Sequence, residues 1–160
     1  MIVAASIITA SASADATTVG PGGTGSNDTP DCSGAAASVG VIWPPNHMMI
    51  SESIVGVTDD PNLPPPSIVV TGITQDEPVA APGSGHTSPD GGGVGTAIAL
   101  VRAERAGPGT GRIYFISFTA TNTLGLQCTG TIYVFVPHDQ GQGFTPIDTG
   151  QRYDSTQTYF

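Results

Sequence analysis

The sequence contains no lysine, and four arginines are its only permanently cationic side chains. Thirteen aspartates and glutamates give the chain a formal net charge of −9. Binding to nucleic acid or to an anionic membrane surface needs a row of cations facing the phosphates. The composition therefore argues against both kinds of partner and leaves cations, neutral glycans and other protein chains.

Residues that favour helices are also scarce. Only 11% of the residues are charged, whereas glycine occurs 22 times and proline 14 times. No window shows a sustained apolar period of 3.6 residues, and Thr, Val, Ile and Ser dominate. This composition predicts an all-β protein with long turns.

Cysteine occurs only twice, and no Cys-x-x-Cys motif or Cys/His cluster is present, which argues against a zinc site. The two thiols, Cys32 and Cys128, either form a disulfide or are two unrelated buried residues.

The first 16 residues read MIVAASIITASASADA and form an apolar stretch with a single charged side chain, Asp15. Residues 12–14 resemble a signal-peptidase site, but no basic segment precedes the apolar run. The stretch is either the remainder of a secretion signal or a retained arm, and it is too short to span a bilayer as a helix. As an arm it suits an extended strand that pairs with another subunit, through Ile2, Val3, Ile7 and Ile8. Residues 17–31 are rich in Gly, Pro, Asn and Asp and read as a linker.

Residues 32–140 are predicted to form a seven-stranded immunoglobulin-like sandwich, followed by a C-terminal arm, 141–160. Short segments of alternating polarity are separated by turn residues about every ten positions, which is typical of such sandwiches. The expected strands are 36–42, 48–57, 67–75, a short strand within 78–93, 95–102, 111–121 and 127–136. Residues 153–160 are a candidate for a further strand, or a frayed tail.

A rigid corner is expected between the first two strands. It contains the only tryptophan, and two prolines fix the backbone and withhold two hydrogen-bond donors. Its residues are Trp43, Pro44, Pro45, Asn46 and His47. The expected role of Asn46 is to bond the backbone of the corner, and that of His47 is structural, since two histidines without cysteine make a weak metal pair.

Strand counting places the two cysteines at one end of the sandwich. If each strand reverses the direction of the one before, the first and seventh strands run parallel. Cys32 and Cys128 then both lie where these strands begin, so we expect a disulfide between them, which requires an oxidising compartment.

The same count gathers four carboxylates and the rigid corner at the opposite end. Ca²⁺ prefers oxygen ligands, so it is one candidate cofactor at this end, held by Asp76, Glu77, Glu104 and Asp139. The favoured alternative is a salt-bridge network in which Arg102 and Arg105 pair with these acids. Tyr114, near the start of the sixth strand, fits a tyrosine corner, in which the hydroxyl bonds nearby backbone.

Five motifs occur in one order between residues 32 and 140: WPPNHMM from Trp43, DEPV from Asp76, LVRAERAG from Leu100, GRIY from Gly111 and VPHDQ from Val136. Together they resemble an immunoglobulin-like module of secreted bacterial proteins, similar to hyalin-repeat and polycystic-kidney-disease-type domains. The resemblance implies an extracellular, non-enzymatic β-sandwich.

No motif points to catalysis. The chain has no Gly-x-Ser-x-Gly nucleophile elbow, and its glycine run at 91–95 lacks the lysine and helix of a phosphate loop. We therefore expect no enzyme. The expected function is a structural subunit of an extracellular bacterial fibre or surface layer that polymerises with its own copies by donating a terminal strand. The alternative is an adhesion or glycan-binding module, with or without Ca²⁺.

Overall fold

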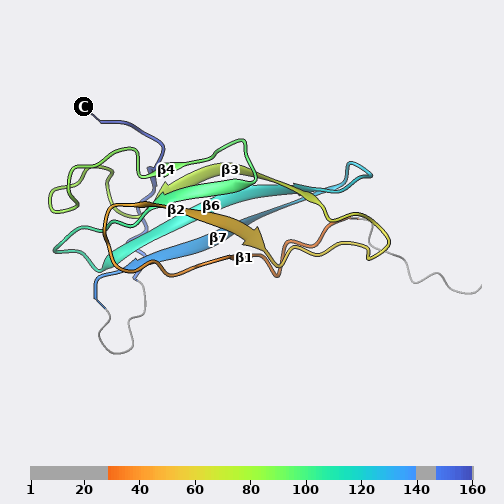
Figure 1. The fold of residues 1–160 in the computed structure, drawn as a ribbon, viewed down its shortest axis with the longest axis horizontal. Coiled ribbons are helices and arrows are strands. Elements are labelled where there is room, and N and C mark those ends of the chain that lie inside the picture. Colours follow the sequence, from red (N-terminus) through yellow and green to blue (C-terminus); the bar gives the residue numbers. More distant parts are fainter. Residues whose placement is uncertain (1–28, 140–146, 160) are drawn as a thin grey trace, which may run out of the picture.

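The computed structural model describes residues 29–139 and 147–159, and it is built entirely from strands and loops (Figure 1). Two four-stranded antiparallel sheets form a sandwich, with the strand orders β1-β2-β5-β4 and β7-β6-β3-β8. The strands are β1 (Ala36–Ala37), β2 (Met49–Val55), β3 (Ser67–Gln75), β4 (Gly91–Gly92), β5 (Ile98–Arg102), β6 (Gly111–Thr121), β7 (Gln127–Pro137) and β8 (Tyr153–Asp154).

The strand order is that of an immunoglobulin fold. With the first seven strands lettered A to G, one sheet reads A-B-E-D and the other G-F-C. The all-β immunoglobulin-like sandwich predicted from the sequence is therefore confirmed, and the expected bounds of β3 and β6 agree with the structure. The count of seven is one short, because β8 pairs with β3 through Thr74 and Gln75.

Alternation along β6 explains why the sheets pack together. Tyr114, Ile116 and Phe118 point into the sandwich and are fully or almost fully buried, as side chains at every second position of a strand share one face. Ile132 and Val134 of β7 belong to the same buried cluster, together with Val70, Ile73, Ala99 and Val101 of β3 and β5. This core holds the two ends of the sandwich in fixed positions.

The expected first strand, 36–42, changes sheets partway along. Ala36 and Ala37 pair with β2, and Val41 then forms a parallel bridge to Phe135 of β7. Glu52 supports the crossing, because its buried Oε2 accepts hydrogen bonds from the Ser38 hydroxyl at 3.1 Å and the Val39 amide at 2.9 Å. The Glu52 carboxylate thus provides hydrogen bonds where the crossing chain no longer pairs with β2.

The C-terminal segment 147–159 closes one side of the sandwich. Its strand β8 pairs with β3, while the carbonyl oxygen of the fully buried Ser155 accepts the amides of Asp90 at 2.9 Å and Gly91 at 2.7 Å. The segment therefore bonds to both sheets. The expected C-terminal arm, 141–160, contributes to the sandwich through its described residues.

The chain passes from one end of the sandwich to the other. In Figure 1 the described chain begins at the right-hand end, and the C-terminus lies at the left. The expected polymerisation residues Ile2, Val3, Ile7 and Ile8 lie outside the described residues. No helix capable of crossing a lipid bilayer occurs within 29–139 and 147–159.

Candidate functional site

A buried arginine organises the end of the sandwich at which β6 begins. Arg112 is 1% exposed and lies on the inward face of β6. Its Nε donates to Glu77 Oε2 at 3.0 Å, and its Nη1 donates to Asp90 Oδ2 at 2.8 Å. Nη2 lies 3.6 Å from Glu104 Oε1, an ion pair without a hydrogen bond. One guanidinium thus meets three carboxylates from two loops, since Glu77 and Asp90 lie at opposite ends of the β3–β4 loop and Glu104 lies in the β5–β6 loop. We call Arg112, Glu77, Asp90 and Glu104 the Arg112 network.

Two further side chains extend this network. Arg102 Nε lies 3.4 Å from Asp90 Oδ1, and its guanidinium also donates to the carbonyl oxygens of Pro89 and His47. The Tyr114 hydroxyl accepts from Arg112 Nη1 at 3.0 Å and donates to the Arg102 carbonyl at 2.9 Å. Burial raises the pKa of Tyr114, so the hydroxyl stays protonated and able to donate. The tyrosine-corner prediction for Tyr114 is therefore confirmed.

The network holds one more carboxylate than it has cations. Arg112 and Arg102 face Glu77, Asp90 and Glu104, all three of which are buried. Burial raises the pKa of Asp90, although the two arginines and a hydrogen bond from Gln75 act in the opposite direction. Asp90 therefore binds a proton at a higher pH than an exposed aspartate does.

The rigid corner predicted from the sequence lies against this network. His47 Nδ1 is 2.9 Å from Glu104 Oε2, the same oxygen to which the Thr87 hydroxyl donates, and the His47 amide donates to the Ala103 carbonyl. Asn46 Oδ1 accepts the Met48 amide at 3.1 Å, which confirms its expected turn-bonding role. Pro44 and Pro45 lead into this contact, whereas Trp43 is 40% exposed and does not anchor the corner in the core.

The other acids predicted for this end have separate partners. Asp76 Oδ1 accepts the Ile113 amide at 2.8 Å, and burial raises its pKa. Asp139 is exposed beside His138, and Arg105 donates to the His138 carbonyl at 2.9 Å. The predicted salt-bridge network exists, but its partners differ. Arg112 takes the place expected for Arg105, and Arg102 meets Asp90 rather than one of the four predicted acids.

The part of the chain that the structure describes contains no preformed cluster of metal ligands. No group of three or more His, Cys, Asp or Glu side chains there is arranged to hold an ion, so Asp76, Glu77, Glu104 and Asp139 do not form one. Glu77 and Glu104 are bound instead to Arg112, His47 and Thr87. Their chemistry is that of a fixed ion-pair network.

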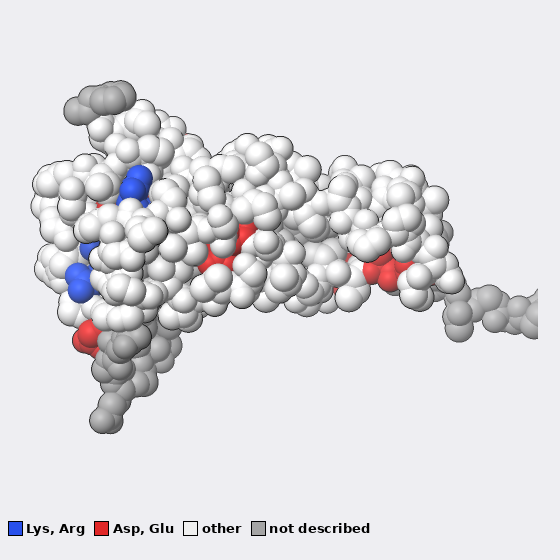
Figure 2. Space-filling view, in the orientation of Figure 1, with Lys and Arg blue, Asp and Glu red and all other residues white. Residues whose placement is uncertain are grey.

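A pocket of about 320 Å³ opens beside the network. Its lining combines polar residues with apolar ones: Asp76, Glu77, Thr110, Thr149 and Gln151 on the polar side, and Pro78, Ala106, Pro108 and Gly109 beside them. Its size lies at the lower end of the range found for small-molecule sites. Figure 2 shows arginine side chains only at this end of the face in view, most of which is otherwise uncharged.

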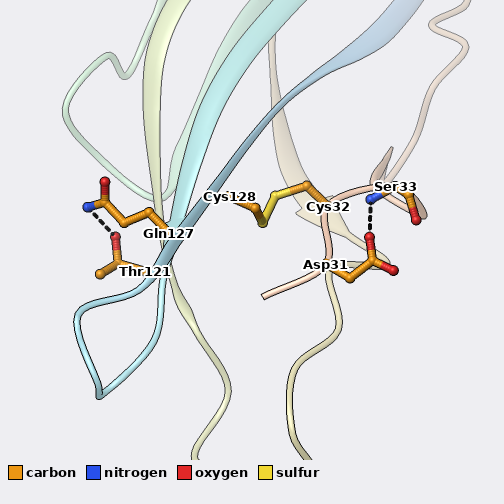
Figure 3. Close-up of a disulfide and its surroundings, with 6 residues drawn as sticks. All are labelled: Asp31, Cys32, Ser33, Thr121, Gln127 and Cys128. Atoms are coloured by element: carbon orange, nitrogen blue, oxygen red, sulfur yellow. Dashed lines mark hydrogen bonds between the residues drawn. A yellow bond between two sulfur atoms is a disulfide. The ribbon is translucent and has the colours of Figure 1, made fainter. Parts of the chain in front are cut away.

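The opposite end carries the disulfide that strand counting predicted. Cys32 and Cys128 are bonded, with their Cα atoms 5.9 Å apart, at the starts of the first and seventh strands (Figure 3). The Asp31 carboxylate beside it accepts the Ser33 amide at 2.8 Å, and Asp31 pairs with Thr58 in an antiparallel bridge. A disulfide is compatible with an oxidising, extracellular location.

Sequence reasoning missed Arg112, Asp90 and Glu52. The sequence does contain a signal for Arg112, because Arg112 shares the inward face of its strand with Tyr114, Ile116 and Phe118. A cation at a core position requires buried carboxylates around it. Which carboxylates these are depends on the paths of the loops, and no local pattern in the sequence specifies those paths.

No protein-family model, curated protein or solved structure matches this chain. The immunoglobulin-like strand order is established by the pairing itself. Membership in the hyalin-repeat or polycystic-kidney-disease-type families stays a prediction.

Proposed function

We propose that this protein is a structural subunit of an extracellular fibre or surface layer, and that its copies join head to tail through a strand donated by the N-terminal arm. The observation that carries this proposal is the passage of the described chain from one end of an elongated sandwich to the other (Figure 1). A subunit with this layout presents different surfaces at its two ends. A contact between unlike surfaces that does not close generates a filament.

The construction of the two ends supports this role. One end is crosslinked by a disulfide, and the other is held by a buried arginine bonded to carboxylates at both ends of the β3–β4 loop. A structural subunit that contacts one neighbour at each end needs rigid contact surfaces at both ends.

The apolar N-terminal arm is the element to test. Replacing Ile2, Val3, Ile7 and Ile8 with serine in the full chain should abolish fibres seen by negative-stain microscopy, because the donated strand loses its apolar side chains. A matched control replaces Ser6 and Ser11 with alanine and should leave the fibres intact. Thermal melting of the soluble protein should be the same for both variants. Unchanged fibres in the four-serine variant would rule out donation by this arm.

The pocket beside the Arg112 network favours a second candidate, an adhesion or glycan-binding module. Its Thr110, Thr149 and Gln151 side chains carry the hydroxyl and amide groups that bond sugar hydroxyls. A glycan array probed with the soluble protein tests this function, with a Thr149→Val variant as the control for any signal. Calorimetric titration with Ca²⁺ tests the metal-dependent version, and an absence of heat would exclude it.

A further inference from the structure

Strand β7 has an open backbone edge. Its register with β6 runs without irregularity from Gln127 to Pro137, so residues at every second position direct their backbone groups to the same side. At Phe135 that side faces away from β6, since its amide and carbonyl bond Gly40 and Ile42 of the first strand. Thr129, Thr131 and Tyr133 therefore also present their N–H and C=O groups away from β6. We call these three residues the β7 edge.

The other outer strands in the described part of the chain, β1, β4 and β8, are each only two residues long. On the β4 side, Asp90 and Gly91 bond Ser155 of the C-terminal segment. On the β3 side, β8 pairs with Thr74 and Gln75, and Val70 exchanges hydrogen bonds with the loop at 95–96. The first strand hydrogen-bonds to the backbone of β7 only at Phe135, although β1 and Cys32 also lie close to β7. The β7 edge is thus the longest run of unpaired strand backbone among the described residues.

This edge also lacks the features that usually protect one. Exposed edge strands normally carry a lysine or other charge, a proline or a bulge that prevents pairing with another chain. Between Gln127 and Val136 the strand has no charged residue and no proline, and its register shows no bulge. Apolar side chains lie exposed at one end of the edge: Val39 is 53% exposed, Val41 58% and Tyr133 51%. A partner strand would bury them.

We propose that the β7 edge binds residues 2–8 of a second copy of this chain as an added β-strand. This inference rests on the proposed function and names the acceptor for the donated arm. Backbone hydrogen bonds supply affinity in such β-augmentation without requiring a particular sequence. Neither the edge nor residues 2–8 carries a charge, so pairing them buries no unpaired ion.

The proposed head-to-tail polymer requires the arm of a second copy rather than the chain's own arm. The disulfide places Cys32 beside Cys128 at the start of β7, and from there the first strand runs parallel to β7 toward Val41. The chain before Cys32 therefore approaches from beyond the end of the sandwich. Twenty-eight residues precede the first described residue, Thr29, and this length of chain is enough for residues 2–8 to reach a neighbouring molecule.

Mixed-chain crosslinking tests the contact directly. Full-length Ile7→Cys and Thr131→Cys proteins are mixed, oxidised and analysed by non-reducing electrophoresis and peptide mass spectrometry. The expected product is a disulfide between residues 7 and 131 of different chains, at least tenfold more abundant than the product with Gln157→Cys, an exposed control on the C-terminal segment. Equal yields for the two acceptors would overturn the inference. So would a crosslink that forms only within a chain carrying both Ile7→Cys and Thr131→Cys.

An edge-blocking variant separates this inference from the proposed function. Thr131→Pro removes an N–H that faces away from β6, so the ladder between β6 and β7 is retained. Fibres should be lost in Thr131→Pro and kept in Thr131→Val. If fibres require the arm but persist in a folded Thr131→Pro protein, the acceptor lies elsewhere and strand donation still holds. If the unaltered chain forms no fibres, the proposed function fails, and absence of the 7–131 crosslink then overturns the acceptor as well. Where Thr131→Pro does not fold, the crosslink decides alone.

Discussion

Replacing Arg112 with methionine is the most informative perturbation of the stability of this fold. The guanidinium donates to two buried carboxylates, at 2.8 and 3.0 Å, and to the Tyr114 hydroxyl. Hydrogen bonds to charged groups contribute about 1.5 to 3 kcal/mol each, and a neutral one about 1 kcal/mol. Methionine fills much of the space but removes the ion-pair partner of Glu77 and leaves Asp90 with Arg102 alone among the described residues. Breaking a buried ion pair by removing one partner costs about 3 to 5 kcal/mol, and we expect a loss of this size.

Urea unfolding at pH 7 with the disulfide intact measures this loss as a lower midpoint at an unchanged slope. Arg105→Met is the matched control, because Arg105 donates to a single backbone carbonyl and should cost about 1 kcal/mol. Adding Asp90→Asn and Glu104→Gln to Arg112→Met should recover part of the stability, since it removes the stranded charges. A loss below about 1 kcal/mol, or one equal to that of Arg105→Met, would refute the view that Arg112 neutralises this end.

Three further predictions concern charge, crosslinking and backbone conformation. Because burial raises the pKa of Asp90, the folded state binds this proton more tightly than the unfolded state does. The free energy of unfolding should therefore fall as the pH rises from about 4 through the folded-state pKa. In urea titrations at several pH values, Asp90→Asn should reduce this dependence of the unfolding free energy on pH, and an unchanged dependence would contradict the prediction. Reducing the disulfide, which links residues 96 positions apart, should cost about 4 to 5 kcal/mol on the chain-entropy model, seen as a lower melting temperature in dithiothreitol. Gly93→Ala should destabilise the fold far more than Gly95→Ala. Both glycines have φ near +85°, so placing an alanine at either position costs about 1 kcal/mol in backbone strain. Only at Gly93 would the new Cβ also collide with a backbone oxygen, that of Ile98. Similar melting temperatures for the two variants would show that the contact at Gly93 relaxes freely.

The sequence predicted the strands best where alternation was clear and turns were short. The bounds of β3 and β6 follow from this pattern, and the disulfide follows from the direction of successive strands. The crossing of the first strand between sheets was not predicted, because it depends on Glu52, a carboxylate at a position that alternation assigns to the core. Local propensity carries no information about a partner 13 residues away.

The location of the charged end was predicted from the sequence, but the ion pairs within it were not. Strand counting correctly brought His47, Glu77 and Glu104 to one end of the sandwich. The cation that joins them is Arg112, which the motif GRIY contains but which reasoning from turns alone did not select. Burial makes the difference, since Arg112 faces the core while Arg105 lies at the margin and bonds a carbonyl.

The disulfide also determines how the molecule responds to a pulling force. Force applied at residue 29 reaches Cys32 and passes through the sulfur atoms to Cys128 at the start of β7. The 96-residue separation between these cysteines is thereby removed from the load path, and about 330 Å of potential extension with it. Six of the eight strands, β1 to β6, lie inside that closed loop. Under tension, a chain of such subunits would lengthen only by the segments outside the loop.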